Sequence, residues 1–358
     1  MIHKHSDYMY WAKTQSRARF NLATSGVGAY PLRELPDLPP LEINGDNSYG
    51  YGPLKDAIAV RYDVAPDCVV TAAGTSMANY LAFATLLEPG DEVVVERPTY
   101  SLLVDSLRYA GATLVPFERL EENGWAIDPE AVRRAVTPRT KLIVLTNLHN
   151  PSSVLTPEPV LLQIGDIARE AGARVLVDEV YLDAVYENTP RSSVHLGARF
   201  VVTGSLTKIY GVSGLRCGWI IAQPELAHAM WRLNDLFAAT AVHPGELLSV
   251  AVLQNLEALR ERSRVVVEAD REALNEFLDR ERGVSAVRTN WGTTALLRLN
   301  RGHAAAFIET LRAAHDTSVV PGNFFGAPDH FRIGMGVDSE MFAEGLRRIG
   351  LHLRNHIQ

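Results

Sequence analysis

Residues 173–181 read Ala-Arg-Val-Leu-Val-Asp-Glu-Val-Tyr, so that a short apolar run ends in the carboxyl group of Asp178. A continuous apolar run of this length is typical of a strand that is buried on both faces, as in a parallel sheet. Acidic side chains are rarely buried without a partner, so an acid directly after such a strand indicates a cationic partner. Read alone, Asp178 could as well be a solvated loop residue or a helix N-cap.

Six further segments repeat this strand pattern on either side, and helical patterns separate many of them. The strands are expected at residues 68–71, 92–96, 113–117, 141–146, 200–203 and 217–222, and the helices at 76–87, 101–110, 129–136 and 157–171. The last two helices end at Pro138 and Gly172, which are helix-stopping residues. This alternation predicts an α/β fold with a mostly parallel, seven-stranded sheet that helices cover on both faces.

The character of the chain changes after about residue 243. Long charged helices are expected at 244–255 (continuing toward 280), 302–314 and 339–354, with short strands at 294–299 and 331–335 between them. We therefore expect a large domain over residues 44–243 and a smaller α+β domain formed by residues 1–43 and 244–358. The proline-rich stretch 31–40 is expected to be an extended connection after an N-terminal helix.

Composition excludes several classes of protein. The 358 residues are 47% apolar and 22% charged, with a net charge of −7 and scattered basic residues, so a nucleic-acid partner is not expected. No apolar run approaches the roughly 18 residues that cross a bilayer, and the start lacks the apolar core of a secretion signal. Cys68 and Cys217 form neither a disulfide framework nor a metal motif. A cytoplasmic protein without a metal site is expected.

Chemically suggestive residues follow five of the predicted strands. They are Gly74-Thr75-Ser76, Tyr100, Asn150, Asp178, and Ser205 with Lys208. Ligands of open parallel sheets bind beyond the carboxyl ends of the strands, so these residues predict one common site. A glycine that opens a helix outlines a phosphate cradle, although Thr or Ser there is also an ordinary N-cap.

Four segments resemble one known family. Residues 205–219 (Ser-Leu-Thr-Lys-Ile-Tyr-Gly-Val-Ser-Gly-Leu-Arg-Cys-Gly-Trp) are similar to the stretch around the Schiff-base lysine of histidinol-phosphate and related aminotransferases. Asn-Pro-Ser-Ser at 150–153 resembles the family turn Asn-Pro-(Thr/Ser)-Gly, Asp-Glu-Val-Tyr at 178–181 its Asp-Glu-x-Tyr, and residues 321–326 with 331–333 its C-terminal arginine region. These segments occur in the same order as in the family and span about residues 25–335. The chain therefore resembles class I/II aminotransferases of pyridoxal-phosphate fold type I.

The resemblance implies pyridoxal 5'-phosphate as cofactor and a role for each matching residue. Lys208 would bind the cofactor as a Schiff base and move the proton at the substrate Cα, while Asp178 would keep the pyridinium nitrogen protonated. The cofactor ring would contact Tyr181, Asn150 and Tyr100. The cofactor phosphate would bind Gly74, Thr75, Ser76, Ser205, Thr207 and Arg216. The substrate would contact Arg332, Gly26 and Asn150.

The implied activity is amino transfer from an α-amino acid to a 2-oxo acid in a homodimer with shared active sites. Tyr49, or as second choice Tyr51, would reach the phosphate bound by the neighbouring subunit. One departure from the family is Ser153, which stands where the family has glycine and puts the local turn geometry in question.

Other functions remain as alternatives. Ser205-x-x-Lys208 fits the Ser-x-x-Lys of penicillin-recognising serine hydrolases, but the Ser-Asp-Asn and Lys-Thr-Gly motifs of that class are missing. A nicotinamide enzyme is disfavoured because Gly26-Val27-Gly28 has no third glycine and no preceding strand. Elimination, decarboxylation and cyclisation use the same cofactor and lysine, so a lyase, a decarboxylase or a cyclising synthase stays open.

Overall fold

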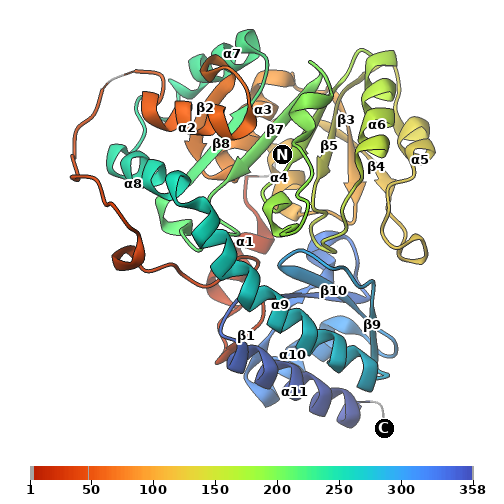
Figure 1. The fold of residues 1–358 in the computed structure, drawn as a ribbon. Coiled ribbons are helices and arrows are strands. Elements are labelled where there is room, and N and C mark those ends of the chain that lie inside the picture. The colour runs from red at the N-terminus through yellow and green to blue at the C-terminus, as the bar shows by residue number, and fades with distance from the viewer. Residues whose placement is uncertain (1–3, 47, 357–358) are drawn as a thin grey trace.

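The computed structural model describes residues 4–46 and 48–356. Its upper part in Figure 1 is built on a seven-stranded sheet with the strand order β2-β8-β7-β6-β5-β3-β4. The strands are β2 (Val69–Ala73), β3 (Glu92–Arg97), β4 (Thr113–Glu118), β5 (Thr140–Thr146), β6 (Arg174–Asp178), β7 (Phe200–Ser205) and β8 (Cys217–Ile221). β8 runs antiparallel to both of its neighbours, and the other pairs are parallel. The predicted mostly parallel sheet is confirmed.

Helices cover both faces of this sheet because successive strand residues point to opposite sides. On β3, Val93 and Val95 share a core with one group of helices, and Val94 belongs to a core on the other face. The first group is α3 (Thr75–Leu86), α4 (Ser101–Tyr109) and α7 (Pro224–Asn234). The other face carries α2 (Gly52–Tyr62), α5 (Pro129–Ala135), α6 (Glu158–Glu170) and α8 (His243–Gln254).

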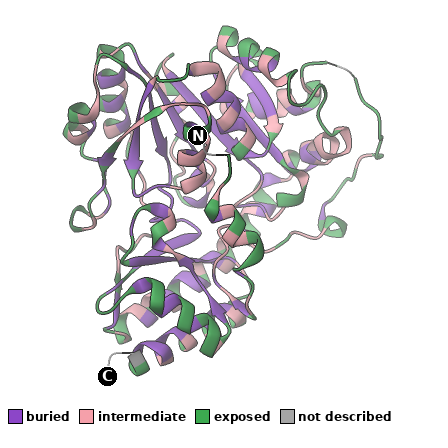
Figure 2. Cartoon of the chain, turned by 180° about the vertical axis from the view of Figure 1, so that it is seen from behind, coloured by how far each residue is buried: buried purple, intermediate pink, exposed green. Residues whose placement is uncertain are grey.

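The lower part of Figure 1 has smaller sheets and a separate apolar core. One sheet is antiparallel, in the order β12-β13-β10-β9, and β1 pairs in parallel with β11. The strands are β1 (Phe20–Asn21), β9 (Val284–Ala286), β10 (Thr294–Leu299), β11 (Thr317–Ser318), β12 (Val320–Pro321) and β13 (His330–Gly334); the helices are α9 (Leu256–Arg280), α10 (Ala304–His315) and α11 (Ser339–His356). Figure 2 shows buried residues following the strands in both parts.

The N-terminal region lies against both parts. Helix α1 (Asp7–Thr14) contacts α4, and residues 31–46 then form a long excursion that Figures 1 and 2 both show and that Leu35 anchors in the core of the upper part. The short 3-10 helices are η1 (Leu32–Glu34), η2 (Pro66–Cys68), η3 (Glu121–Asn123), η4 (Leu182–Ala184), η5 (Ser193–Leu196), η6 (Ser213–Leu215) and η7 (Gly322–Phe325).

The expected continuous helix from 244 toward 280 is wrong, because the chain breaks at Asn255. The side-chain Nδ2 of Asn255 donates to the carbonyl of Ala251 at 2.9 Å, and its backbone N–H donates to the carbonyl of Val252 at 3.0 Å. A side chain that bonds to the last turn competes with continuation of the helix, so α8 ends there and α9 starts anew. Among the described residues, no helix combines the length and apolarity needed to span a membrane.

Candidate active site

The predicted site residues gather at one edge of the large sheet. β2, β3, β5, β6 and β7 run in the same direction, so their carboxyl ends share an edge. Asp178 is the last residue of β6, and the other strand ends are followed directly or within a short loop by Gly74, Tyr100, Asn150 and Lys208.

Lys208 lies under the N-terminal segment of the chain. Its Nζ donates to the Ser25 hydroxyl at 2.7 Å and lies 5.8 Å from the centre of the Tyr181 ring. The backbone N–H of Val27 donates to the Lys208 carbonyl at 2.9 Å. A Cβ on Gly26 would approach that carbonyl oxygen to 3.0 Å, so glycine permits the close passage of the segment over Lys208.

Asp178 is buried at the end of β6 among neutral hydrogen-bond donors. One carboxylate oxygen accepts from Asn79 Nδ2 at 2.9 Å and the other from the Val180 N–H at 3.1 Å. Thr203 holds Asn79 in turn, because its hydroxyl donates to Asn79 Oδ1 at 2.6 Å. Burial raises the pKa of Asp178 to about 6, although these hydrogen bonds and the charge of Lys208 lower it. A cation beside this carboxyl would restore its charge.

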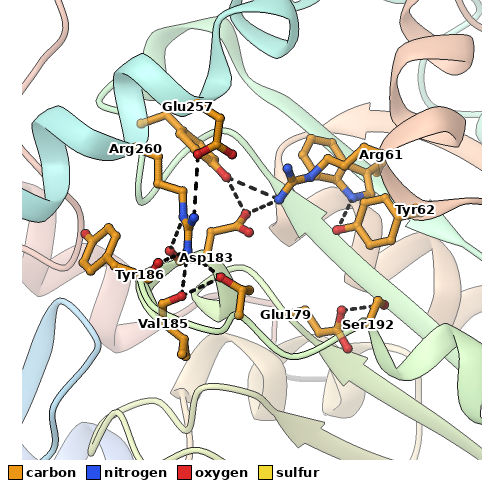
Figure 3. Close-up of polar contacts among 12 residues, drawn as sticks. Arg61, Tyr62, Glu179, Asp183, Val185, Tyr186, Ser192, Glu257 and Arg260 are labelled. Carbon is orange, nitrogen blue, oxygen red and sulfur yellow. Dashed lines mark hydrogen bonds and ion pairs between the residues drawn. The ribbon is translucent and has the colours of Figure 1, made fainter.

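The neighbouring acid, Glu179, has a different environment. Its carboxylate accepts a hydrogen bond from the Ser192 hydroxyl at 2.7 Å (Figure 3). It also accepts from the Ser193 backbone N–H and hydroxyl. Burial raises the pKa of Glu179 to about 7 in spite of these bonds. Glu179 therefore anchors the loop that contains Ser192 and Ser193. Asp178 instead lies at the carboxyl edge of the sheet, with Asn79 and the Val180 N–H as its partners.

A concave backbone site forms where α3 begins. Gly74, with φ of +81°, precedes the helix, and a Cβ there would lie 2.3 Å from Arg216 Nη2. The same nitrogen donates to the Ala73 carbonyl at 3.2 Å, and Nη1 donates to the Ser213 carbonyl at 3.3 Å. The first N–H groups of a helix have no partner within it, so a guanidinium and free donors meet at this point.

Hydroxyl groups complete this cradle. Ser205 and Thr207 share a hydrogen bond of 2.6 Å between their hydroxyl oxygens. The Thr75 hydroxyl is buried and has no hydrogen-bond partner among the described residues, while Ser76 is exposed. Donors at a helix start beside an arginine suit a phosphate group.

Arg332 on β13 faces the site from the smaller sheet. Its side chain is fully buried, and its Nη1 donates to Asn150 Oδ1 at 2.9 Å. Nη2 donates to the Tyr8 hydroxyl at 3.2 Å, and the guanidinium carbon lies 4.9 Å from the centre of the Phe325 ring. Asn150 is itself fixed, since its backbone N–H donates to the Thr146 hydroxyl at 3.0 Å.

Two tyrosines line the same region. Tyr100 is the N-cap residue of α4; its hydroxyl lies 3.9 Å from Met9 Sδ, and burial raises its pKa well above the ordinary value. The Tyr181 hydroxyl is buried and has no hydrogen-bond partner among the described residues. Tyr181 therefore offers a hydroxyl to a ligand, whereas the Tyr100 hydroxyl is taken by Met9 and its ring remains for a contact.

A polar network ties the site loops to surrounding helices (Figure 3). The carboxylate of Asp183 accepts hydrogen bonds from Arg61 Nη2 on α2 and from the Tyr210 hydroxyl. Asp183 follows Tyr181 by two residues, and Tyr210 follows Lys208 by two residues. The network therefore connects the loops after β6 and β7.

Arg260 extends the network from α9. Its Nε donates to the Asp183 carbonyl at 3.1 Å, and its Nη2 donates to the carbonyls of Val185 at 2.6 Å and Tyr186 at 3.0 Å (Figure 3). The loop after β6 is thus fixed from two helices.

Comparison with known proteins identifies the family. Residues 44–349 match the family described as aminotransferase class I and II. The chain belongs to the class I and II aminotransferases.

Similar proteins agree with this assignment. Capreomycidine synthase of Streptomyces vinaceus is 30% identical over 354 residues, which cover 95% of this chain and 91% of the relative. Arginine–pyruvate transaminase of Pseudomonas aeruginosa is 30% identical over 319 residues, 83% of this chain and 79% of the relative. A solved pyridoxal-phosphate-dependent aminotransferase of Streptococcus suis has a TM-score of 0.92 at 26% identity and covers 99% of both chains. The chain is a pyridoxal-phosphate-dependent aminotransferase of fold type I.

The residues at the strand ends fit this cofactor. Thr75 and Tyr181 offer buried hydroxyl groups that have no partner in the described part of the chain, and the Arg216 guanidinium lies beside Gly74. Asp178 offers a buried carboxyl among neutral donors, which a protonated pyridine nitrogen complements. These are the groups that a phosphorylated pyridine aldehyde requires.

The departure at Ser153 has a structural explanation. Ser153 adopts a left-handed conformation with φ of +61°, which favours the glycine of the family turn. Its hydroxyl donates to the Thr294 carbonyl at 2.8 Å and lies 3.0 Å from the Thr294 hydroxyl. A Cβ on Gly292 would lie 2.3 Å from Ser153 Cβ, so glycine opposite makes room for the serine. Serine is therefore accommodated in this turn by the hydrogen bonds to Thr294 and by Gly292 opposite.

The two candidate tyrosines of the N-terminal region lie away from Lys208 within this chain. The half-exposed Tyr49 donates to Asp235 Oδ2 at 3.1 Å and contacts the Trp231 ring. Tyr51 is the N-cap residue of α2, and its ring meets that of His243 edge to face. The choice between them stays a prediction.

Sequence reasoning missed three residues of the site: Ser25, Asn79 and Tyr8. Asn79 lies one helical turn after Thr75, a spacing that could have placed it on the same face of α3. Ser25 and Tyr8 lie far from Lys208 and Arg332 in the sequence, and no motif marks them.

Proposed function

We propose that this chain transfers the amino group of an α-amino acid to a 2-oxo acid, with pyridoxal phosphate held by Lys208. The environment of Arg332 carries this proposal. Its guanidinium is fully buried, and no carboxylate of the described residues lies within ion-pair distance of it. A buried, uncompensated guanidinium suits a carboxylate ligand, and donor and acceptor of this reaction share that group.

The chain supplies specific chemistry around the bound cofactor. When bound, pyridoxal phosphate provides an electron sink that favours proton loss from the Cα of an amino acid. Lys208 Nζ is the attachment point and afterwards the base that takes and returns the Cα proton. Asp178, which Asn79 holds in place, would accept a hydrogen bond from the ring nitrogen and keep it protonated.

The remaining predicted residues orient the ligands. Asn150 and Tyr181 would hydrogen-bond the ring oxygen of the cofactor, and Tyr100 would stack on its ring. The phosphate would bind to the donors at the start of α3, to the hydroxyl pair and to the arginine, namely Gly74, Thr75, Ser76, Ser205, Thr207 and Arg216. Gly26 lets the backbone pass close to Lys208, where it would contact the substrate.

We further infer a cytoplasmic homodimer in which Tyr49 or Tyr51 of one subunit reaches the phosphate of the other. Exposed apolar side chains support a second copy, since Ile43 is 82% and Leu236 77% exposed. We assign residues 44–243 to the cofactor-binding domain and residues 1–43 and 244–358 to the small domain. The boundary at residue 243 needs one correction, because α8 packs its apolar residues against the large sheet and so belongs with the cofactor-binding domain.

The test is a single-turnover reaction of the holoenzyme with candidate amino acids and no acceptor. We expect one equivalent of 2-oxo acid per active site, with the amino group retained by the enzyme until a 2-oxo acid is added. Release of ammonia or carbon dioxide instead would reject amino transfer.

Synthase activity is the second candidate. It is favoured by the similarity to capreomycidine synthase, because that match covers 95% of this chain. The same experiment separates the two, because a cyclised product without retained amino group would identify a synthase.

A further inference from the structure

Arg332 has neutral hydrogen-bond partners in a buried position. Asn150 Oδ1 and the Tyr8 oxygen accept from its two terminal nitrogens, and its buried Nε has no partner among the described residues. Burying a charge without a counter-charge is costly, so the groups around Arg332 are arranged for an anion that arrives from outside the chain.

Tyr8 reaches this place from α1, 324 residues away in the sequence. It is 7% exposed, and its ring meets those of Tyr100 at 5.5 Å and Phe324 at 5.6 Å, both edge to face. These contacts fix the ring and leave its hydroxyl directed at Arg332.

The Tyr8 hydroxyl has a hydrogen to spare. Its one hydrogen bond to the described residues is accepted from Arg332, so its own O–H has no acceptor there. Burial raises the pKa of Tyr8, but the charges of Arg332 and Lys208 and the hydrogen bond from Arg332 outweigh it, and the net pKa is lowered. A more acidic phenol is a stronger hydrogen-bond donor.

We propose that Tyr8 is a substrate-binding residue whose hydroxyl donates to the carboxylate that Arg332 binds. The inference rests on the proposed function and adds α1 to the substrate site. A carboxylate has about four acceptor positions and accommodates both the guanidinium and the phenol. Carboxylate binding then links α1 to β13.

The experiment compares two ligands that differ only in the carboxylate: 2-methylalanine, which has no Cα hydrogen to lose, and 2-aminopropane. Their dissociation constants are measured from the cofactor absorbance of holoenzyme. We expect Tyr8→Phe to raise the dissociation constant of 2-methylalanine at least about tenfold, which is the effect of losing a hydrogen bond to a charged group. The dissociation constant of 2-aminopropane should stay unchanged. Tyr10→Phe is the control, because Tyr10 lies in α1 but is 64% exposed.

A second measurement follows α1 directly. We expect 2-methylalanine to slow hydrogen exchange of the α1 amides in the wild type and not in Tyr8→Phe, with equal melting temperatures showing that both are folded.

The outcomes separate this inference from the proposed function. Arg332→Lys should weaken 2-methylalanine binding, and an unchanged constant there would reject the proposed carboxylate site itself. If Arg332→Lys weakens binding but Tyr8→Phe does not, the assignment of Tyr8 alone is wrong. Equal weakening of both ligands by Tyr8→Phe would show a structural role and would also overturn it.

Discussion

Two adjacent acids, Asp178 and Glu179, show how neighbours decide chemistry at the scale of one residue. Both are buried, and burial raises the pKa of both. Serine donors on a nearby loop satisfy Glu179, whereas Asp178 is held by Asn79 and the Val180 N–H. The sequence motif contains both acids, but only the folded chain shows which one is bound by the serine loop and which one is held by Asn79 at the carboxyl edge of the sheet.

The raised pKa of Asp178 predicts a pH-dependent stability of the cofactor-free protein. Its pKa of about 6, against 3.8 ordinarily, favours folding below about pH 4, and this stabilisation is lost as the pH rises through 6. The difference between these two pKa values corresponds to about 3 kcal/mol of unfolding free energy. The unfolding free energy, measured with urea from pH 4 to 7, should therefore fall more steeply in the wild type than in Asp178→Asn. Parallel curves would contradict a raised pKa of Asp178.

Asp178→Asn should also slow catalysis. A neutral amide cannot hold the pyridinium proton, so we expect the cofactor to bind and the single-turnover rate to fall by several orders of magnitude. An unchanged rate in the variant with bound cofactor would reject the role of Asp178.

Lys208 should be the attachment point of the cofactor. Borohydride reduction followed by peptide mapping should find the cofactor on the Lys208 peptide, and Lys208→Ala should abolish the reduced adduct. Lys141→Ala is the control, because Lys141 is exposed near the start of β5, at the opposite edge of the sheet. Label on any other lysine of the wild type would show the assignment to be wrong.

Ser153 allows two opposing effects to be compared. Ser153→Ala removes its hydrogen bonds to Thr294 but keeps the left-handed backbone, so we expect a loss of about 1–2 kcal/mol in unfolding free energy. Ser153→Gly removes the same bonds but relieves about 1 kcal/mol of backbone strain, so its loss should be smaller. Urea unfolding measures the two losses of unfolding free energy. A larger loss for Ser153→Gly than for Ser153→Ala would contradict backbone strain at Ser153.

At the scale of elements, the strands were the most predictable part. Burial on both faces leaves a continuous apolar run, and an apolar run marked all seven strands of the large sheet, including the edge strand β4, in which only Phe117 is buried. Helices α2 and α7 were missed, as were two-residue strands such as β1 and β11, which are too short to show a period. The site contacts of Ser25, Asn79 and Tyr8 span 183, 99 and 324 residues, so tertiary packing alone creates them.

The network around Asp183 predicts how strongly the elements depend on one another. Asp183→Asn leaves Arg61 without a counter-charge, and about a quarter of each side chain is exposed. We therefore expect a loss of about 2–3 kcal/mol, below the cost for a fully buried pair. Glu170→Gln, which breaks the exposed pair with Arg133, should cost at most about 1 kcal/mol. Equal losses in urea unfolding would show that the network is not structural.

At the scale of the whole molecule, the long excursion of residues 31–46 and the exposed apolar residues around it are hard to explain in a single chain. Leu41 is 56%, Ile43 82% and Val242 77% exposed. Apolar side chains of this size are usually covered by another surface, and a symmetric pair of chains would cover them on both copies. We accordingly expect sedimentation to give a dimer, and a fully active monomer would refute it.

Shared active sites can be tested by mixing variants. If Tyr49 of one subunit completes the site of the other, Lys208→Ala and Tyr49→Phe proteins should each be nearly inactive, yet a mixed dimer contains one site with both native residues. Activity should therefore return after unfolding and refolding the two together. Tyr49 currently donates to Asp235 in its own chain, so Tyr51→Phe is tested in parallel. Recovery with Tyr51→Phe instead would move the role to Tyr51, because only the tyrosine that crosses the boundary can complement. Recovery with neither would mean that each subunit completes its own site.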